Sequence, residues 1–496
     1  MKVATKRILA ITLAFVMLIG TLLLTACNST EDPPVTDDTT TAQKPSDTTK
    51  PVGGEEEKEP TREDAEPTSD NDYSGRKVNI LVRQGSSLLE GQENDVQSIS
   101  DEIVKRTLYI EDKYNIEMML TPVGDRDDMP TLQGSYLNGD QLFDMIAPHP
   151  TINLAPLMAS GMLQDLGDSA TLGGHVDLTK LWWNQSQVEG FTVKGKLFIG
   201  SPDFNLNKRG VHLLVLNKET WDSVYQDENI HDIVFDGNWT IQKMIDVMSE
   251  NYDEQAKEYG FVGNTSIAAF FYTGIGGKLL VKDENGDWIH KFDVDVCSAL
   301  AEKLYSMLIG PQTLLEHYYY NGFATSEVWK TFSEGRALIQ AMDIDYFGKM
   351  LAAVPFQTAY IPYPKLNDQQ DKYYSYGGTG FMGIPNDAKD LEFCGLIMET
   401  ANWYTYHKLR PIYFDSYLSV MVSKNENDYK VIEMVVNNGI FDFGEILDSS
   451  GLEQGTAVGM WVDVIVENLS TDVASYIEEW EDANNEKFQT FLREIY

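Results

Sequence analysis

The sequence predicts an α/β fold, because short apolar strands alternate with helical segments along its folded part. Residues 78–82 form a β-branched run, and apolar residues then recur at helical spacing between Val96 and Ile110. A second strand-like run follows at residues 116–120. The order strand, helix, strand is typical of a parallel sheet with helices on its faces.

A third strand is predicted at residues 143–147, and a loop that contains Pro148 and Pro150 ends it. In open α/β sheets, ligands bind beyond the carboxyl ends of the strands. This rule points to Arg83 and Gln84 after the first strand and to His149 after the third.

The chain then predicts a second block of α/β structure. The apolar run at residues 211–216 is expected to cross into this block. Thr240 is expected to cap an amphipathic helix, residues 281–292 have the pattern of a hairpin that turns at Asn285 and Gly286, and a final amphipathic helix includes Val473.

The first 27 residues have the pattern of a secretory signal that ends in a lipobox. A basic start precedes the apolar residues 8–24, and small residues then precede Cys27. This stretch resembles the lipobox of bacterial lipoproteins, in which the cysteine becomes acylated, so Cys27 is the expected lipidation site. A short N-terminal membrane helix is the alternative.

Residues 28–72 predict a disordered tether. They are rich in Thr, Asp, Glu and Pro, with too few apolar residues to offset the conformational entropy of folding. The whole chain has a formal charge of -39, which disfavours nucleic acid and anionic lipid headgroups as partners of its surface. Apart from Cys27, only Cys297 and Cys394 are present; two buried thiols are favoured over a disulfide.

The order of these elements resembles that of the extracellular solute-binding proteins of bacterial ABC importers, especially the carbohydrate-binding, maltose-binding-protein-like group known as family 1. The resemblance spans most of residues 73–496. Long insertions and a C-terminal extension depart from a compact member, and the family's sugar contacts cannot be aligned one for one. The segments that carry it lie at residues 144–146, 163–166, 182–183, 195–198, 214–218, 239–240, 332–338, 340–342, 361–364 and 377–380.

The resemblance implies a two-lobed periplasmic-binding-protein-like fold of type II. Each lobe is a sheet flanked by helices, and crossing hinge segments join the lobes, which close on a ligand. We expect residues 73–205 and 356–403 in the first lobe, and residues 211–354 and 404–496 in the second.

A sugar offers a flat apolar face and a rim of hydroxyls, so its site needs aromatic rings and planar polar groups. Each ring taken alone is more often part of a core, Asp343 and Asp345 also fit a solvated turn, and only one of Trp182 and Trp183 would face a cleft if they lie on a strand. The polar candidates past strand ends are Arg83, Gln84, His149, Asn205, Asn264, Thr265, Asp343, Asp345, Tyr346, Gly378 and Thr379. The candidate rings are Trp182, Tyr272, Trp329, Tyr376 and Trp403.

The sequence lacks a complete motif for binding a dinucleotide or a metal, or for hydrolase chemistry. Gly378, Gly380 and Gly383 have the spacing of a dinucleotide fingerprint, but Pro385 follows where a helix should open. Residues 283–294 begin like a calcium loop, yet Trp288 stands where the glycine is needed. The seven histidines never fall at metal-ligand spacing, and no G-x-S-x-G elbow occurs. We therefore expect no catalytic residue, no cofactor and no metal.

These observations together predict a lipid-anchored receptor on the extracytoplasmic side of a cell membrane. It would capture a small organic ligand, preferably an oligosaccharide, by hinge closure and present it as a monomer to an ABC permease, without chemistry. Three alternatives stay open: a receptor for a peptide or another solute, a surface enzyme that degrades polysaccharide, and an adhesin or sensor without a transporter.

Overall fold

The computed structural model describes most of the chain after residue 64. The predicted lipidation site Cys27, the tether up to residue 64 and the site candidates Asp345, Tyr346 and Thr379 lie outside the described residues. No described helix is both long and apolar enough to cross a membrane. The described ranges are 65–89, 97–149, 152–206, 210–284, 288–317, 323–344, 350–351, 353–378, 380–413, 425–444 and 460–494.

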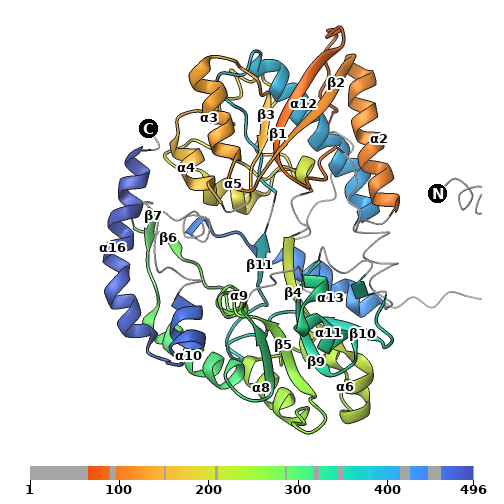
Figure 1. Ribbon diagram of the computed structural model, residues 1–496, viewed down its shortest axis with the longest axis vertical. Coiled ribbons are helices and arrows are strands. Elements are labelled where there is room, and N and C mark those ends of the chain that lie inside the picture. The colour runs from red at the N-terminus through yellow and green to blue at the C-terminus, as the bar shows by residue number, and fades with distance from the viewer. Residues whose placement is uncertain are drawn as a thin grey trace, which may run out of the picture. The chain divides into compact units, whose positions relative to one another are not determined.

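A parallel three-stranded sheet, in the order β2-β1-β3, forms the centre of the first lobe (Figure 1). Ile80 in β1 pairs with Leu120 in β2 and with Met145 in β3, as the three predicted strands require. The first-lobe elements are β1 (Arg76–Arg83), α2 (Gln97–Tyr114), β2 (Ile116–Val123), α3 (Asp128–Asn138), β3 (Met145–Ala147), α4 (Leu154–Ala159), α5 (Gln185–Phe191) and the 3-10 helix η1 (Asp203–Asn205).

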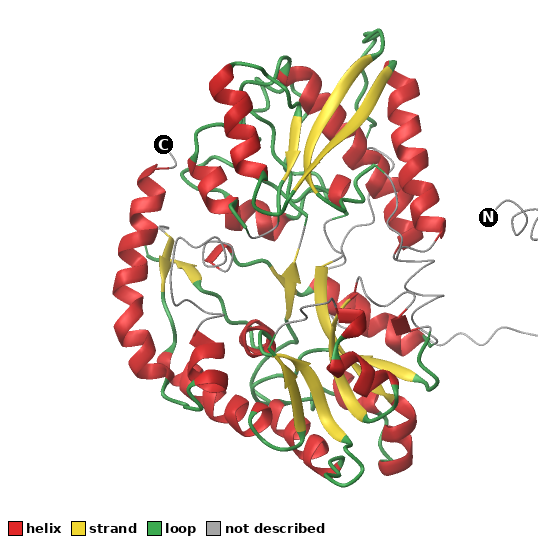
Figure 2. Cartoon of the chain, in the orientation of Figure 1, coloured by secondary structure: helices red, strands yellow, loops and turns green. Residues whose placement is uncertain are grey.

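A mixed seven-stranded sheet forms the centre of the second lobe, in the order β12-β11-β4-β9-β5-β8, with β10 also paired to β4. Figure 2 shows helices packed around the strands of this sheet. Its elements are β4 (Gly210–Asn217), α6 (Lys218–Val224), α7 (Ile230–Phe235), α8 (Ile241–Glu250), β5 (Tyr259–Asn264), α9 (Ile267–Gly274), α10 (Val294–Leu308), β8 (Thr313–Glu316), η2 (Phe323–Thr325), α11 (Glu327–Ser333), β9 (Ala337–Asp343), β10 (Thr358–Ile361), β11 (Ser375–Gly378), α13 (Glu426–Asn437) and β12 (Gly439–Ile440).

The remaining elements connect or extend the two lobes. The predicted hairpin is present as an antiparallel strand pair, and its turn residues Asn285 and Gly286 lie outside the described part. These elements are β6 (Leu280–Lys282), β7 (Trp288–His290), α12 (Leu391–Tyr404), the π-helices η5 (Thr405–Leu409) and η7 (Val462–Glu467), and α16 (Val473–Glu494).

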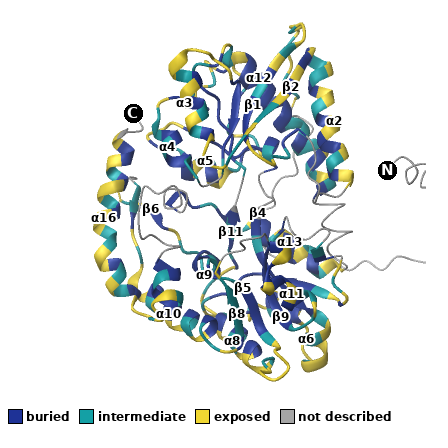
Figure 3. Ribbon diagram, in the orientation of Figure 1, coloured by how far each residue is buried: buried dark blue, intermediate teal, exposed yellow. Residues whose placement is uncertain are grey.

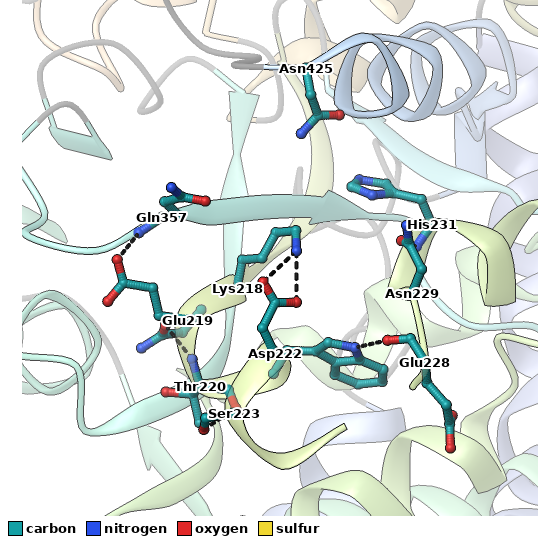
Figure 4. Close-up of polar contacts among 12 residues, drawn as sticks. Lys218, Glu219, Thr220, Asp222, Ser223, Glu228, Asn229, His231, Gln357 and Asn425 are labelled. Carbon is teal, nitrogen blue, oxygen red and sulfur yellow. Dashed lines mark hydrogen bonds and ion pairs between the residues drawn. The ribbon is translucent and has the colours of Figure 1, made fainter. Parts of the chain in front are cut away.

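Short polar side chains begin several of the helices in the second lobe. Thr240 caps α8 as predicted, because its side chain accepts a hydrogen bond from the backbone N–H of Lys243. Asn217 caps α6 in the same way. Figure 4 shows that Glu219, in the first turn of α6, accepts a hydrogen bond of 3.3 Å from the backbone N–H of Gln357, which fastens α6 beside the start of β10.

Each lobe has its own hydrophobic core. The strands are largely buried, whereas the outer faces of the helices are exposed (Figure 3). The first core contains Ile80, Ile146 and Leu396, and the second contains Leu214, Phe261 and Ile339. Cys394 lies in the first core and Cys297 in the second, and both are free thiols, as the sequence favoured.

The chain returns to the first lobe later than we expected. We placed residues 356–403 there, but β10 and β11 both pair with β4 in the second sheet. Among the described residues after β11, Phe381 is the first whose side chain enters the core of the first lobe. Backbone pairing with β4 therefore holds residues 358–378 in the second lobe.

Two of the passages between the lobes are hydrogen-bonded to each other. The hydroxyl of Ser201 donates to the carbonyl of Gly380 at 3.1 Å, and the Asn205 amide donates to the carbonyl of Phe381 at 3.4 Å. The crossing segments therefore run next to each other where the chain leaves and re-enters the first lobe.

Helix α16 belongs to both lobes, although we assigned residues 404–496 to the second lobe alone. Val473 and Ile477 enter the second core, whereas Phe488 and Phe491 enter the first. The Asn485 amide accepts from the backbone N–H of His290 at 2.7 Å and donates to its carbonyl at 3.0 Å. This pair of bonds fixes the helix to β7.

Candidate functional site

A hollow of about 50 Å³ lies at one edge of the second sheet; we call it the second-lobe hollow. Strands β5 and β9 are parallel, so their last residues, Asn264 and Asp343, reach the same edge. Strand β4 is antiparallel to β9 and places His212 opposite Asp343. The hollow is lined by His212, Asn264, Ile267, Phe270, Phe323, Ala341, Met342 and Asp343.

Three rings form an aromatic surface at this hollow. Phe270 from α9 and Tyr376 from β11 stack with their ring centroids 4.6 Å apart and their planes inclined by 25°. The ring of His212 lies 4.4 Å from Phe270 and 5.4 Å from Tyr376. All three side chains are partly exposed. Such a surface offers an apolar face next to hydrogen-bonding groups, which is what a sugar ring requires.

The polar edge of the hollow brings an imidazole and a carboxyl group together. His212 Nε2 lies 3.4 Å from a carboxylate oxygen of Asp343. Burial lowers the pKa of His212 to about 4, so the imidazole is neutral at pH 7. The His212–Asp343 pair therefore places a neutral imidazole next to a carboxyl group.

The first lobe also has polar groups at its strand ends. Arg83, the last residue of β1, has its Nε 3.7 Å from a carboxylate oxygen of Asp125. Gln84 follows it and is exposed. His149, just past β3, donates its backbone N–H to Asp128 at 3.0 Å, and its Nδ1 accepts the backbone N–H of Ile152 at 3.1 Å.

The loop contacts of His149 define which form of its ring is present. Burial lowers its pKa, and the positive charge of Arg83 acts in the same direction. Since Nδ1 accepts a hydrogen bond, the neutral ring carries its proton on Nε2. The strand ends of the first lobe thus combine a guanidinium, an amide and a neutral imidazole.

Several predicted site residues are instead structural. Tyr272 and Trp329 are 6% and 9% exposed and belong to the second core. The hydroxyl of Thr265 donates to the carbonyl of His317 at 3.0 Å. Trp403 packs against the first core, its ring 5.1 Å from His407. These residues lie in or next to strands and helices whose apolar faces are covered. The sequence alone does not distinguish a covered face from one that is open to a cleft.

Two further candidates lie at the crossing between the lobes. Asn205 closes η1, and its amide binds the returning chain at Phe381. Gly378 is the last residue of β11 and pairs with Gly210, the first residue of β4. Both residues therefore belong to the crossing segments between the lobes, rather than to the polar residues at the strand ends of the first lobe or at the second-lobe hollow.

The expectation that one of Trp182 and Trp183 faces a cleft is wrong. The segment turns instead of forming a strand, so both indoles point into the first core. Trp182 Nε1 donates to one oxygen of Glu399 at 2.5 Å, and Trp183 Nε1 donates to the other at 2.7 Å. Glu399 on α12 therefore holds both rings.

His212 and Phe270 were not among the predicted site residues. His212 is the one polar side chain in the apolar run of residues 211–216, and this interruption was the available signal. Phe270 lies in an apolar helix, where nothing in the sequence distinguishes it from Phe271, which is fully buried. Within the described residues, no group of three His, Cys, Asp or Glu side chains is placed to hold a metal ion.

Comparison with protein-family models and with curated protein sequences yields no match. Solved structures do match. The ABC substrate-binding protein Lmo0181 of Listeria monocytogenes, in complex with cycloalternan, aligns with a TM-score of 0.57 at 12% identity, over 84% of this chain and 99% of its own. The galacto-N-biose-/lacto-N-biose I-binding protein of Bifidobacterium longum, in complex with lacto-N-biose, gives 0.57 at 13%, over 85% and 99%.

The GacH receptor of Streptomyces glaucescens also matches, with a TM-score of 0.53 at 13% identity, over 84% of this chain and 99% of its own. At identities this low, the structural match establishes the fold alone. The predicted two-lobed fold, with its resemblance to the sugar-binding proteins of ABC importers, is therefore confirmed at the level of structure.

Proposed function

We propose, from the fold that this chain shares with sugar-binding proteins of ABC transporters, that it is a receptor for a polyhydroxylated solute. The preferred ligand is an oligosaccharide, which the protein binds, encloses by hinge closure and delivers unchanged to a membrane permease. Neighbours with this fold are binding proteins of transporters, which favours binding over catalysis.

The observation that carries the proposal is the aromatic surface of Phe270 and Tyr376 beside the polar residues of the second-lobe hollow. A pyranose ring stacks on an aromatic face through its axial C–H groups while its equatorial hydroxyls reach amides and carboxylates. Asn264 and Asp343 supply those groups at the same edge. The volume of about 50 Å³ accommodates only part of a sugar ring, so most of a ligand would extend out of the hollow.

The strand ends of the first lobe would supply the second set of contacts. Arg83 ends β1, Gln84 follows it, and His149 lies just past β3. In the second lobe, Asn264 and Asp343 end β5 and β9 in the same way. A ligand that contacts both sets favours the closed form, because only contacts made better in that form shift the population.

The test measures binding of neutral oligosaccharides by calorimetry, with thermal shift as a screen. Phe270→Ala and Tyr376→Ala should each weaken binding at least about tenfold, a loss of about 1.4 kcal/mol. Phe235→Ala is the matched control, because Phe235 is a ring on α7 of the same lobe and is 44% exposed. It should leave the affinity unchanged.

The bound glycan should be recovered intact, which distinguishes a receptor from a degrading enzyme. Release of shorter glycans by the wild-type protein would contradict the proposal. Binding of peptides but no glycan would assign the protein to another class of solute receptor.

We further propose that the receptor is lipid-anchored through Cys27 and faces the extracytoplasmic side. The basis is the signal-like sequence that ends at this cysteine. Labelled palmitate should be incorporated into the wild-type protein in cells, and Cys27→Ala should abolish labelling and release the protein into the soluble fraction. Labelling that persists in Cys27→Ala would contradict this assignment.

A further inference from the structure

The most deeply buried residues that line the second-lobe hollow are apolar, and we call them its apolar floor. They are Ile267 from α9, Phe323 from η2, and Ala341 and Met342 from β9. Their exposed fractions are 1%, 5%, 7% and 2%, in the same order, and all four belong to the second core. The hollow is therefore a place where the second core reaches the surface of the lobe.

The hydrogen-bonding side chains at the hollow lie nearer to solvent than this floor. Asn264 ends β5 and His212 lies in β4, and both are partly exposed. The stacked rings of Phe270 and Tyr376 lie beside them. A ligand group that matches this arrangement is apolar at its inner end and polar next to the sugar ring.

The volume of the hollow limits the size of that group. The hollow measures about 50 Å³, whereas a site for one water molecule needs only about 10–15 Å³. A single sugar hydroxyl would leave much of this space unfilled and would find no hydrogen-bonding side chain at the apolar floor. A substituent of several non-hydrogen atoms is required.

The acetamido group of an N-acetylated amino sugar has this size and this polarity. Its methyl group is apolar and lies furthest from the sugar ring, and its planar amide lies next to the ring. The amide of Asn264 can donate to the acetamido carbonyl or accept from the acetamido N–H. The methyl group of a 6-deoxy sugar is smaller and brings no amide to the mouth of the hollow, so it matches the arrangement less well.

We propose that the second-lobe hollow binds the acetamido group of an N-acetylated amino sugar, while the sugar ring stacks on Phe270 and Tyr376. The methyl group packs on the apolar floor, and the amide hydrogen-bonds at the mouth, where Asn264 lies. The inference rests on the proposed function and names the substituent that the ligand carries.

The test compares matched disaccharides with and without the acetamido group by calorimetry on the full-length receptor. The pairs are chitobiose and cellobiose, and N-acetyllactosamine and lactose. The acetamido member of at least one pair should bind at least about tenfold more tightly than its hydroxyl partner. The N-formyl analogue of that member lacks only the methyl group and should bind at least about threefold more weakly than it, because the apolar floor then loses its contact.

Ala341→Val tests the same site from the side of the protein, because the larger side chain occupies part of the hollow. It should reduce the preference for the acetamido member to within about threefold. The matched control is Ala337→Val, the same change on the same strand at a residue that is 3% exposed and does not line the hollow. It should keep the preference of the wild-type protein. Circular dichroism and melting temperatures check that both variants are folded, and the ligand series on the wild-type protein needs no variant.

The outcomes separate this inference from the proposed function. Three results each overturn the acetamido site and leave the sugar receptor standing: glycans bind but the acetamido group brings no gain, the N-formyl analogue binds as tightly as the N-acetyl sugar, or the preference is unchanged in folded Ala341→Val. If no saccharide binds but another solute does, the proposed sugar receptor fails, and the acetamido site fails with it.

Discussion

Replacing Glu399 by glutamine tests how the first lobe is held together. The carboxyl group of Glu399 accepts one hydrogen bond from each of the buried indoles of Trp182 and Trp183, which are 2% and 1% exposed. Both oxygens keep acceptor capacity when the group is protonated. Glutamine has nearly the same shape but only one acceptor oxygen. In either orientation of the amide, its NH₂ group faces an indole N–H, and that donor is left without an acceptor.

The expected loss of stability follows from this geometry. A buried donor without an acceptor costs about 1–3 kcal/mol. We therefore expect Glu399→Gln to lower the free energy of unfolding of the first lobe by about 2 kcal/mol at pH 5. Urea unfolding followed by tryptophan fluorescence measures this change. Since a two-lobed protein can unfold in more than one step, the transition that reports on Trp182 and Trp183 is the one to compare.

The pH dependence gives a second reading of the same group. Burial raises the pKa of Glu399 to about 8, from 4.5 in a freely solvated glutamate. Between these two values the folded state keeps a proton that the unfolded state has lost, so stability falls as the pH rises. The free energy of unfolding of the wild-type protein should exceed that of Glu399→Gln at pH 5. This difference should shrink as the pH rises from 5 to 8, by at most about 1.4 kcal/mol per pH unit.

Glu478→Gln on α16 is the control, because Glu478 is exposed, and it should change stability by less than about 0.5 kcal/mol. If Glu399→Gln is as stable as this control at pH 5, the two indoles do not depend on the carboxylate. An advantage over Glu399→Gln that does not change with pH would show that Glu399 is already ionised in the folded protein at pH 5.

Three further predictions concern the loop, the helix and the thiols. His149→Ala should weaken ligand binding, which calorimetry measures, and unchanged affinity would remove His149 from the site. Since the ring also accepts the backbone N–H of Ile152, the variant should also lower the melting temperature of the empty protein slightly, which a thermal melt measures. Asn485→Ala removes both bonds to His290 and should cost about 1–3 kcal/mol of stability in urea, whereas a neutral effect would mean that water replaces the amide. In a Cys27→Ser background, Cys297 and Cys394 should react with Ellman's reagent only after unfolding, because burial raises both thiol pKa values; prompt reaction in the native state would contradict their burial.

The sequence was informative where local pattern decides structure. The β-branched run at residues 78–82, the cap at Thr240 and the amphipathic helix from Val473 all depend on neighbours within a few positions, and each was predicted. Pairing between distant segments was not predictable in this way. Strands β10 and β11 are four residues each, and only their backbone bonds to β4 place them in the second lobe.

The candidate site residues likewise divide into those that local pattern predicted and those that depend on packing between distant segments. Asn264 and Asp343 were found because they end strands, and the parallel register of β5 and β9 brings them to one hollow. Their role in binding remains a prediction. Tyr272 and Trp329 could not be told from Tyr376 in the sequence, because a ring on a covered face and a ring on an open face have the same chemistry. The difference lies in what packs over them.

The attachment of α16 to both cores limits how the protein can bend. Twenty-two helical residues make a rod about 33 Å long, and one end packs with Val473 while the other packs with Phe491. A rod anchored at both ends resists being stretched, so any swing of one lobe should pivot near it and leave the opposite side to travel furthest. We therefore expect α16 to set the axis of any motion between the lobes.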